Sequence, residues 1–166
     1  EPAIFRQSFE RPNLSYSIFK VESRAARLVE ILQKVPGTAI VYCKTRKKTR
    51  EFAALLEAHK INAACYHAGL AQDDRKERQE KWIRNEIRVM VCTNAFGMGI
   101  DKPDVRLVVH TDPPDCLENY YQEAGRAGRD GKKAYGVLLY HSSDLEEMYN
   151  LPESRYPPMN IIRQVY

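Results

Sequence analysis

Short apolar runs that alternate with amphipathic helical patterns are the feature of this sequence that most limits its fold. Residues 38–43 and 87–92 are apolar almost without interruption, which is typical of strands buried on both faces of a parallel sheet. Further strands are expected at 63–66, 107–110 and 135–140. Helices are expected at 24–35, 72–84 and 116–127, and one more follows residue 43 and runs to His59. Strands separated by helices predict an α/β fold, a doubly wound and mostly parallel sheet with helices on both faces.

In a sheet of this kind, ligands collect beyond the carboxyl ends of the strands. The loops after Cys43, Tyr66, Cys92 and His110 are therefore where functional side chains are expected. Residues of unusual type do cluster in these loops, as the motifs below show.

Composition sets limits on the class of protein. The 166 residues suffice for one domain with a core, and 43% hydrophobic with 29% charged residues excludes a disordered or fibrous chain. A formal charge of +4 permits a polyanionic partner without requiring one. The four cysteines form no CxxC pair, so reduced core thiols are expected rather than disulfides or a metal site. No apolar run of about 18 residues predicts a membrane span.

The expected globular part is 24–150. Residues 1–23 are interpreted as a lead-in from a preceding domain, and residues 151–166, which begin in a proline-rich stretch, as an exit linker and the start of a following element. Because the chain opens with Glu1 and stops inside an apolar pattern, we interpret it as a fragment of a longer protein.

The segment 120–131 places two arginines, Arg126 and Arg129, three residues apart beside three glycines. On a helix this spacing puts both side chains on one face. Guanidinium groups stay charged and can stabilise the charge that develops on a transferring γ-phosphate, so we interpret the pair as arginine fingers. The alternative is a solvated basic helix end, but three helix-end glycines, at roughly 1 kcal/mol each, favour a functional reason.

The apolar run 87–92 is followed by Thr93 and Asn94, whose side chains and backbone N–H groups could hold a nucleic-acid phosphate. Gly97 and Gly99 would let the backbone approach a ligand closely. Asp101 could accept hydrogen bonds from a ribose hydroxyl or from one of the arginines, or could merely cap the loop before a proline.

After the first buried strand, Thr45 is expected to cap the next helix and, with Arg46, to contact DNA phosphates. We interpret the solvent-exposed face of that helix as carrying Lys47, Lys48 and Arg50. His67 follows the second strand, and no carboxylate or metal ligand beside it in the sequence makes it catalytic.

These segments resemble the motifs of RecQ-family helicases. QEAGRAGRDG (122–131) is similar to motif VI, the segment 89–103 to motif V, 40–46 to motif IV, and YHAGL (66–70) and RPN (11–13) to further family segments. The resemblance implies a second RecA-like domain, with His67 facing the DNA path and with Gly99, Asp101, Gln122 and the two arginines facing ATP at an inter-domain cleft.

The sequence contains neither GxxxxGKS/T nor a DExH segment, so no loop of its own cradles the β- and γ-phosphates. In the RecQ family those elements, and hence most contacts to ATP and Mg²⁺, belong to a preceding N-terminal RecA-like domain of the same chain. The resemblance further implies an intracellular 3′ to 5′ DNA helicase, cytoplasmic or nuclear, acting in repair and recombination on single-stranded or duplex DNA. The isolated fragment is then expected to be inactive.

Two alternatives remain. An RNA helicase domain would share the fold and the arginines, but DEAD-box proteins typically carry HRxGRxGR where this chain has QEAGRAGR. A non-catalytic nucleic-acid adaptor would not need Asp101, Arg126 and Arg129. No protein-bound metal site and no membrane partner are expected.

Overall fold

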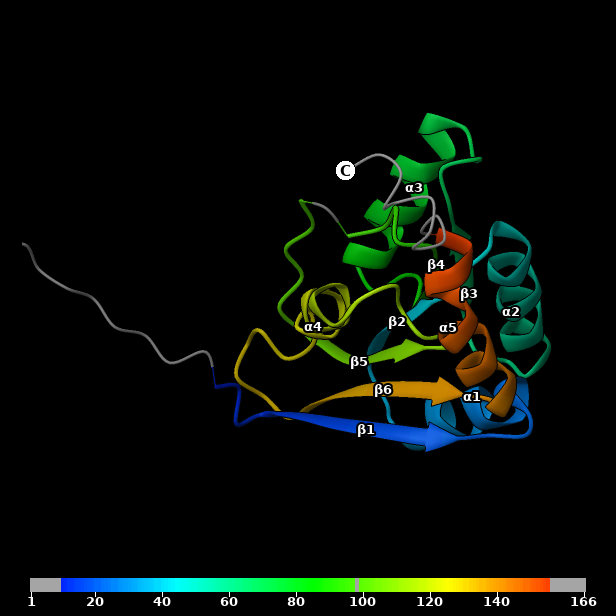
Figure 1. Ribbon diagram of the computed structural model, residues 1–166. Coiled ribbons are helices and arrows are strands. Elements are labelled where there is room, and N and C mark those ends of the chain that lie inside the picture. The colour runs from blue at the N-terminus through cyan, green and yellow to red at the C-terminus, as the bar shows by residue number, and fades with distance from the viewer. Residues whose placement is uncertain (1–9, 98, 156–166) are drawn as a thin grey trace, which may run out of the picture.

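The computed structural model describes residues 10–97 and 99–155, with side chains as far as 149. Its centre is a six-stranded sheet in the order β1-β6-β5-β2-β4-β3, in which every neighbouring pair is parallel (Figure 1). The strands are β1 (Leu14–Lys20), β2 (Thr38–Tyr42), β3 (Ala63–Tyr66), β4 (Val89–Cys92), β5 (Val105–His110) and β6 (Ala134–Tyr140). The helices are α1 (Arg24–Lys34), α2 (Arg46–Ala58), α3 (Gln72–Ile83), α4 (Leu117–Ala124) and α5 (Ser142–Arg155).

Two apolar cores lie on opposite faces of the sheet. On one face, α1 and α2 pack Leu28 and Leu56 against alternate strand residues such as Val41. On the other face, Trp82 of α3 and Phe96 of the loop after β4 cover Met90 and its neighbours. Successive strand side chains point to opposite faces, so burial on both sides explains why the central strands are continuously apolar.

Local signals set where the helices begin. The hydroxyl of Ser23 accepts from the backbone N–H of Ala26 at the start of α1, and that of Thr45 accepts from the N–H of Lys48 at the start of α2. Gly37, at φ +98°, turns the chain between α1 and β2. The helix that starts with Thr45 therefore stands directly beyond the carboxyl end of β2.

The α/β fold predicted from the sequence is confirmed, and the sheet is parallel throughout. One strand was not predicted. β1 lies within the segment interpreted as a lead-in and pairs with β6 along its whole length, from Leu14 to Lys20. At the other end α5 continues past residue 150 to Arg155. The domain boundaries stay predictions, and residues 1–9 and 156–166 lie outside the described part.

No helix within the described residues is long and apolar enough to cross a membrane. The four cysteines carry free thiols, with Cys43 and Cys92 buried, Cys65 half-buried and Cys116 exposed. Burial raises the pKa of the Cys43 thiol to about 12 and that of Cys92 well above its ordinary value, so both stay protonated. These two cysteines are packing residues, as expected.

Candidate functional site

The carboxyl ends of β2, β3 and β4 lie side by side, which brings the predicted DNA-contacting residues together. Thr45 caps α2 through a 3.2 Å hydrogen bond from the N–H of Lys48, so the capping part of its prediction is confirmed. Thr45 and Arg46 are exposed at this edge. The positive end of the helix dipole and the guanidinium of Arg46 together favour an anion here. Contact with DNA itself stays a prediction.

His67 lies beyond β3 and is only 3% exposed. Neither ring nitrogen has a hydrogen-bond partner among the described residues. Its pKa lies below the ordinary histidine value because burial and the charges of Arg50, Arg46 and Arg78 all disfavour the imidazolium. A buried ring with two unpaired nitrogens beside three arginines is costly unless an anion completes the set.

Gly69 lets the chain pass between these groups. A Cβ atom built at Gly69 would lie 3.0 Å from Nη1 of Arg46 and 3.2 Å from Nδ1 of His67. Two residues that are 21 positions apart in the sequence therefore flank one backbone position. The structure brings Arg46 and His67 to the same point of the edge.

Thr93 and Asn94 continue this edge beyond β4. The N–H of Thr93 donates to the carbonyl of Tyr66 at 3.2 Å, which joins the ends of β3 and β4. Asn94 is exposed and shares a surface pocket with Lys44 of the loop after β2. All five predicted DNA-contacting residues thus lie on adjacent loops at one end of the sheet.

The arginine pair lies elsewhere. The N–H of Gly128 donates to the carbonyl of Val105, the first residue of β5, at 2.8 Å, and the N–H of Asp130 donates to the carbonyl of Pro103 at 3.1 Å. The loop after α4 therefore runs along one face of the sheet toward the amino ends of the strands. The arginine loop is thus not among the loops beyond the carboxyl ends, and the loop from β4 to β5, which begins at that edge, runs back across the same face to meet it.

Arg126 is held by the backbone of this loop. Its Nη1 donates to the carbonyl of Gly97, while its Nε is buried without a partner among the described residues. Gly97 has φ +112°, and a Cβ there would lie 2.6 Å from Cζ of Arg126. Only glycine lets the backbone and the guanidinium approach so closely, which explains why the motif has glycine at this position.

Arg129 pairs with Asp101 through an Nη1–Oδ1 distance of 3.1 Å. The prediction that Asp101 could accept from one of the arginines is confirmed. Asp101 is 82% exposed, so the pair adds little stability and leaves the guanidinium free to turn toward an incoming anion. Gly99 (φ +76°) and Gln122 are exposed near this loop, and their contact with nucleotide stays a prediction.

Two residues of the RPN segment support the arginine loop, a role that was not predicted. Arg11 donates to the carbonyls of Gly125 and Ala127 at 3.2 and 2.8 Å. Asn13 donates through Nδ2 to the carbonyl of Gly128 at 2.7 Å. The resemblance of this segment to the family was the available signal, but nothing in the sequence says that it reaches across to residues more than a hundred positions away.

Lys48 does more than lie on the solvent-exposed face of α2. Its ammonium pairs with Asp112, a buried carboxylate that also accepts from the N–H of Lys44 at 3.2 Å. Arg24 lies 3.7 Å from the same carboxylate. Lys48 therefore fixes α2 to the loop after β5, whereas Lys47 and Arg50 are exposed as expected.

Metal-ligating side chains do not gather in this site. Across residues 10–97 and 99–155, no three His, Cys, Asp or Glu side chains lie together so as to hold a metal ion. The groups that the site offers to a ligand are guanidinium ions, hydroxyls and backbone N–H groups, all of which suit phosphate oxygens.

Known proteins are similar to this chain in both sequence and fold. Residues 23–131 match the family model described as helicase conserved C-terminal domain. The ATP-dependent DNA helicase RecQ of Bacillus subtilis is 45% identical over 138 residues, which are 82% of this chain and 23% of that protein. A protein of Acanthamoeba polyphaga mimivirus, named as an ATP-dependent RNA helicase, is 44% identical over 141 residues, 84% of this chain and 26% of that protein.

Among solved structures, a DEAD box protein from the hyperthermophile Methanococcus jannaschii superposes with a TM-score of 0.71 at 26% identity, covering 86% of this chain and 40% of that one. The chain thus spans about a quarter of the length of the curated relatives named above. The family model, the RecQ relatives and the RecA-like sheet agree, and the chain belongs to the helicase conserved C-terminal domain family, in its RecQ-type branch.

Proposed function

We propose that this chain is the C-terminal motor domain of an ATP-dependent 3′ to 5′ DNA helicase. It supplies arginine fingers to an ATP site shared with an N-terminal RecA-like domain of the same protein, holds single-stranded DNA by its phosphates, and is inactive alone. The observation that carries the proposal is the attachment of Arg126 to the carbonyl of Gly97 and of Arg129 to Asp101, beside a separate phosphate-binding edge.

The arginines act on the phosphoryl group. Charge that develops on the γ-phosphate oxygens is stabilised by guanidinium groups already held in place, an effect of about 10³–10⁵ in rate for arginine fingers. Arg129, at 39% side-chain exposure, can leave Asp101 for the phosphate, and Asp101 then becomes available to a ribose hydroxyl. Gly99 and Gln122 line the approach to the nucleotide.

Mg²⁺ is assigned to the N-terminal RecA-like domain. The described residues offer no cluster of carboxylates for it, and their contribution to ATP is positive charge. When bound, Mg²⁺ neutralises phosphate charge and orients the β- and γ-oxygens. The arginines of this chain complete the same electrostatic environment from the opposite side of the cleft.

The strand-end edge holds the nucleic acid. Thr45, Arg46, Thr93 and Asn94 bring hydroxyl, guanidinium and amide groups to adjacent loops at this edge, with the nearly buried imidazole of His67 beside them. Phosphate contacts of this kind fix the position of a strand and carry no sequence information. ATP-driven closure of the two domains then moves the strand past this edge.

The test is DNA-stimulated ATP hydrolysis by the parent protein with Arg126→Ala or Arg129→Ala. We expect turnover to fall by about 10³-fold or more while DNA affinity is retained. Arg27→Ala is the matched control, because Arg27 lies in α1 on the opposite face of the sheet and pairs there with Glu30. Near-normal turnover in both finger variants would refute the assignment, and hydrolysis by the isolated fragment would refute the shared site.

RNA is the second candidate substrate, favoured by the mimivirus relative, which is named as an ATP-dependent RNA helicase. The same phosphate-binding edge would serve either strand, since the groups named above do not read bases. Competition between DNA and RNA strands of equal length for the parent protein decides between them. Equal or tighter RNA binding, together with stronger stimulation of hydrolysis by RNA, would replace DNA in the proposal.

A further inference from the structure

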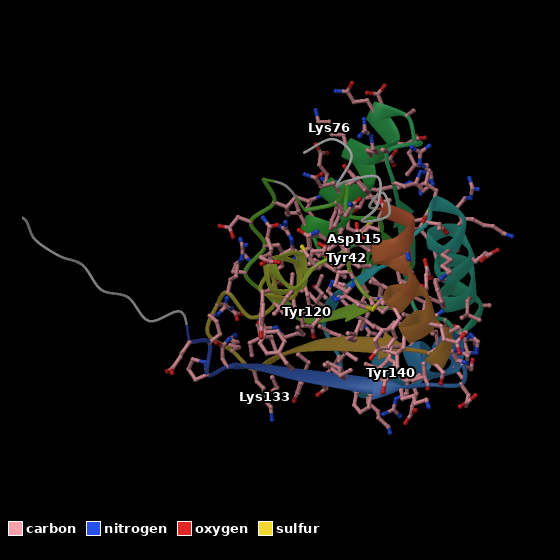
Figure 2. All side chains as sticks on the ribbon, viewed as in Figure 1. Tyr42, Lys76, Asp115, Tyr120, Lys133 and Tyr140 are labelled. Atoms are coloured by element: carbon pink, nitrogen blue, oxygen red, sulfur yellow. The ribbon has the colours of Figure 1, made fainter. Side chains whose placement is uncertain are left out.

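A buried polar chain of side chains lies between the two halves of the site. Tyr42 and His110 are the last residues of the neighbouring strands β2 and β5, and their rings stack at 5.1 Å with an interplanar angle of 20°. Nε2 of His110 donates to Oε2 of Glu123 in α4 at 2.7 Å. His110 is 1% exposed and Tyr42, which Figure 2 labels, is 4% exposed, while the side chain of Glu123 is 14% exposed.

One end of this chain reaches the loop that carries the predicted DNA contacts. The hydroxyl of Tyr42 donates to the carbonyl of Phe96 at 3.3 Å. Phe96 in turn donates through its N–H to the carbonyl of Thr93 at 3.1 Å, which closes a turn around Asn94. Burial raises the pKa of Tyr42, so its hydroxyl keeps the proton that it donates.

The other end reaches the arginine loop. Glu123 lies in the last turn of α4, and its backbone carbonyl accepts from the N–H of Arg126 at 3.2 Å. The charges of Arg126 and Glu123 both act on the Tyr42 hydroxyl. A displacement of the loop after β4 therefore reaches Arg126 by two routes, directly through Gly97 and through the buried side chains.

Stability alone does not account for a polar chain at this position. A carboxylate that is mostly buried beside an imidazole loses much of its hydration, and apolar residues of the same size often stabilise a core equally well or better. Nδ1 of His110 also has no partner among the described residues, which adds a cost. A buried hydrogen bond of defined geometry fixes the orientation of the side chains that it joins, whereas apolar packing does not.

We propose that Tyr42, His110 and Glu123 are positioning residues that couple DNA bound at the loop after β4 to the placement of Arg126 at ATP. The inference rests on the proposed function, since it assumes a nucleic-acid edge and an arginine finger. What it adds is that the effect of bound DNA passes through the contacts between Tyr42, His110 and Glu123 and sets the rate of DNA-stimulated ATP hydrolysis.

The experiment compares ATP hydrolysis by the parent protein without DNA and at saturating single-stranded DNA. Tyr42→Phe removes only the hydroxyl that reaches Phe96 and keeps the stacked ring. His110→Ala removes the link to Glu123, and His110→Gln restores an N–H donor near Nε2. Tyr135→Phe is the matched control, because Tyr135 lies near the amino end of β6 and packs against the core on the opposite face of the sheet from Tyr42.

For Tyr42→Phe and His110→Ala, we expect the ratio of stimulated to unstimulated rate to fall at least about fivefold, the lower range of coupling between sites. The loss should appear in kcat rather than in KM for ATP, and His110→Gln should recover part of it. Tyr135→Phe should leave the ratio unchanged. Saturating DNA removes any effect of weaker binding from the comparison.

Two results would overturn the inference. One is a wild-type ratio in both variants, and the other is an equal fall of both rates together with a lower melting temperature, which marks a purely structural role. A wild-type parent that DNA does not stimulate, or Arg126→Ala with normal turnover, would instead show that the proposed function itself has failed. The wild-type and Arg126→Ala measurements therefore separate the two failures.

Discussion

Gly97→Ala is the sharpest perturbation that the structure offers, because it moves Arg126 without changing that residue. A Cβ at Gly97 would lie 2.6 Å from Cζ, 2.7 Å from Nε and 2.9 Å from Nη1 of Arg126. Ordinary van der Waals contact begins at 3.4 Å, so the guanidinium must retreat by about 0.8 Å. The φ of +112° adds backbone strain of about 1–3 kcal/mol.

The retreat sets the expected size of the effect. A misplacement of about 1 Å costs about 10²-fold in rate when a group must meet a reacting centre in fixed geometry. Complete loss of an arginine finger costs about 10³–10⁵-fold. We therefore expect Gly97→Ala to lower the DNA-stimulated turnover of the parent protein by about 10²-fold, less than Arg126→Ala does.

The control separates displacement from strain. Gly131 has φ +79° and nothing within 4 Å of its Cβ position, so Gly131→Ala adds backbone strain without touching Arg126. Its cost of about 1–2 kcal/mol should lower the melting temperature by several degrees and leave turnover near wild type. Hydrolysis at saturating ATP and DNA, with thermal unfolding followed by circular dichroism, measures both quantities.

A folded Gly97→Ala variant that turns over ATP as fast as Gly131→Ala would refute this prediction. In that case, the contact between the loop and the guanidinium would have no bearing on catalysis. Equal losses of turnover in the two variants would also refute it, because strain alone would then be sufficient.

Three further outcomes are expected. Asn13→Ala should destabilise the domain by about 1–3 kcal/mol in urea unfolding and should lower turnover, because it removes the two hydrogen bonds that Asn13 donates to the carbonyls of Gly128 and Lys132; a full loss of stability with unchanged turnover would contradict the bracing role. The pKa of His67 is depressed in the folded protein, so folding favours the neutral ring, and the free energy of unfolding should fall as the pH drops below 6.5. DNA phosphates favour the imidazolium, so DNA should bind more tightly at low pH, by up to about tenfold in affinity per pH unit. His67→Gln should abolish this pH dependence of binding in anisotropy titrations. Asp112→Ala should cost about 1–3 kcal/mol in the same unfolding assay because Lys48 and the N–H of Lys44 lose their shared acceptor, while no measurable change would mean that the pair adds nothing to stability.

Most of the fold follows from periodicity, and the missed strand shows the limit of that signal. The central strands are apolar on both faces, so they are distinct from the helices even without homologous sequences. β1 instead has exposed Tyr16 and Ile18 with Ser15 and Ser17 alternating with them, the pattern of an edge strand with one face open to solvent. Such a pattern near a chain end resembles a linker unless its partner strand is already known.

The site was predictable in its parts and not in its arrangement. Arg129 beside Asp101 could be anticipated, since both residues stand in motifs whose chemistry is complementary. The position of the arginine loop, and its bracing by Asn13, depend on contacts more than a hundred residues apart in the sequence. The role of Tyr42 was hidden for a different reason, because a tyrosine that ends an apolar strand is indistinguishable from a packing residue until its hydroxyl is seen to reach Phe96.

A single loop serves both halves of the site, and its anchoring explains how it can do so. The loop from β4 to β5 begins at Thr93 on the strand-end edge and reaches Asp101 beside Arg129. Between them, Phe96 is 1% exposed and packs its ring edge-on against Tyr66 at 4.8 Å and Trp82 at 5.3 Å. A segment anchored in a close-packed core moves together with its neighbours rather than bending freely, so the proposed coupling requires Phe96 and the rings packed on it to shift as one unit. Under the proposed function, this shared anchor is how one loop would join strand binding at one end to nucleotide chemistry at the other.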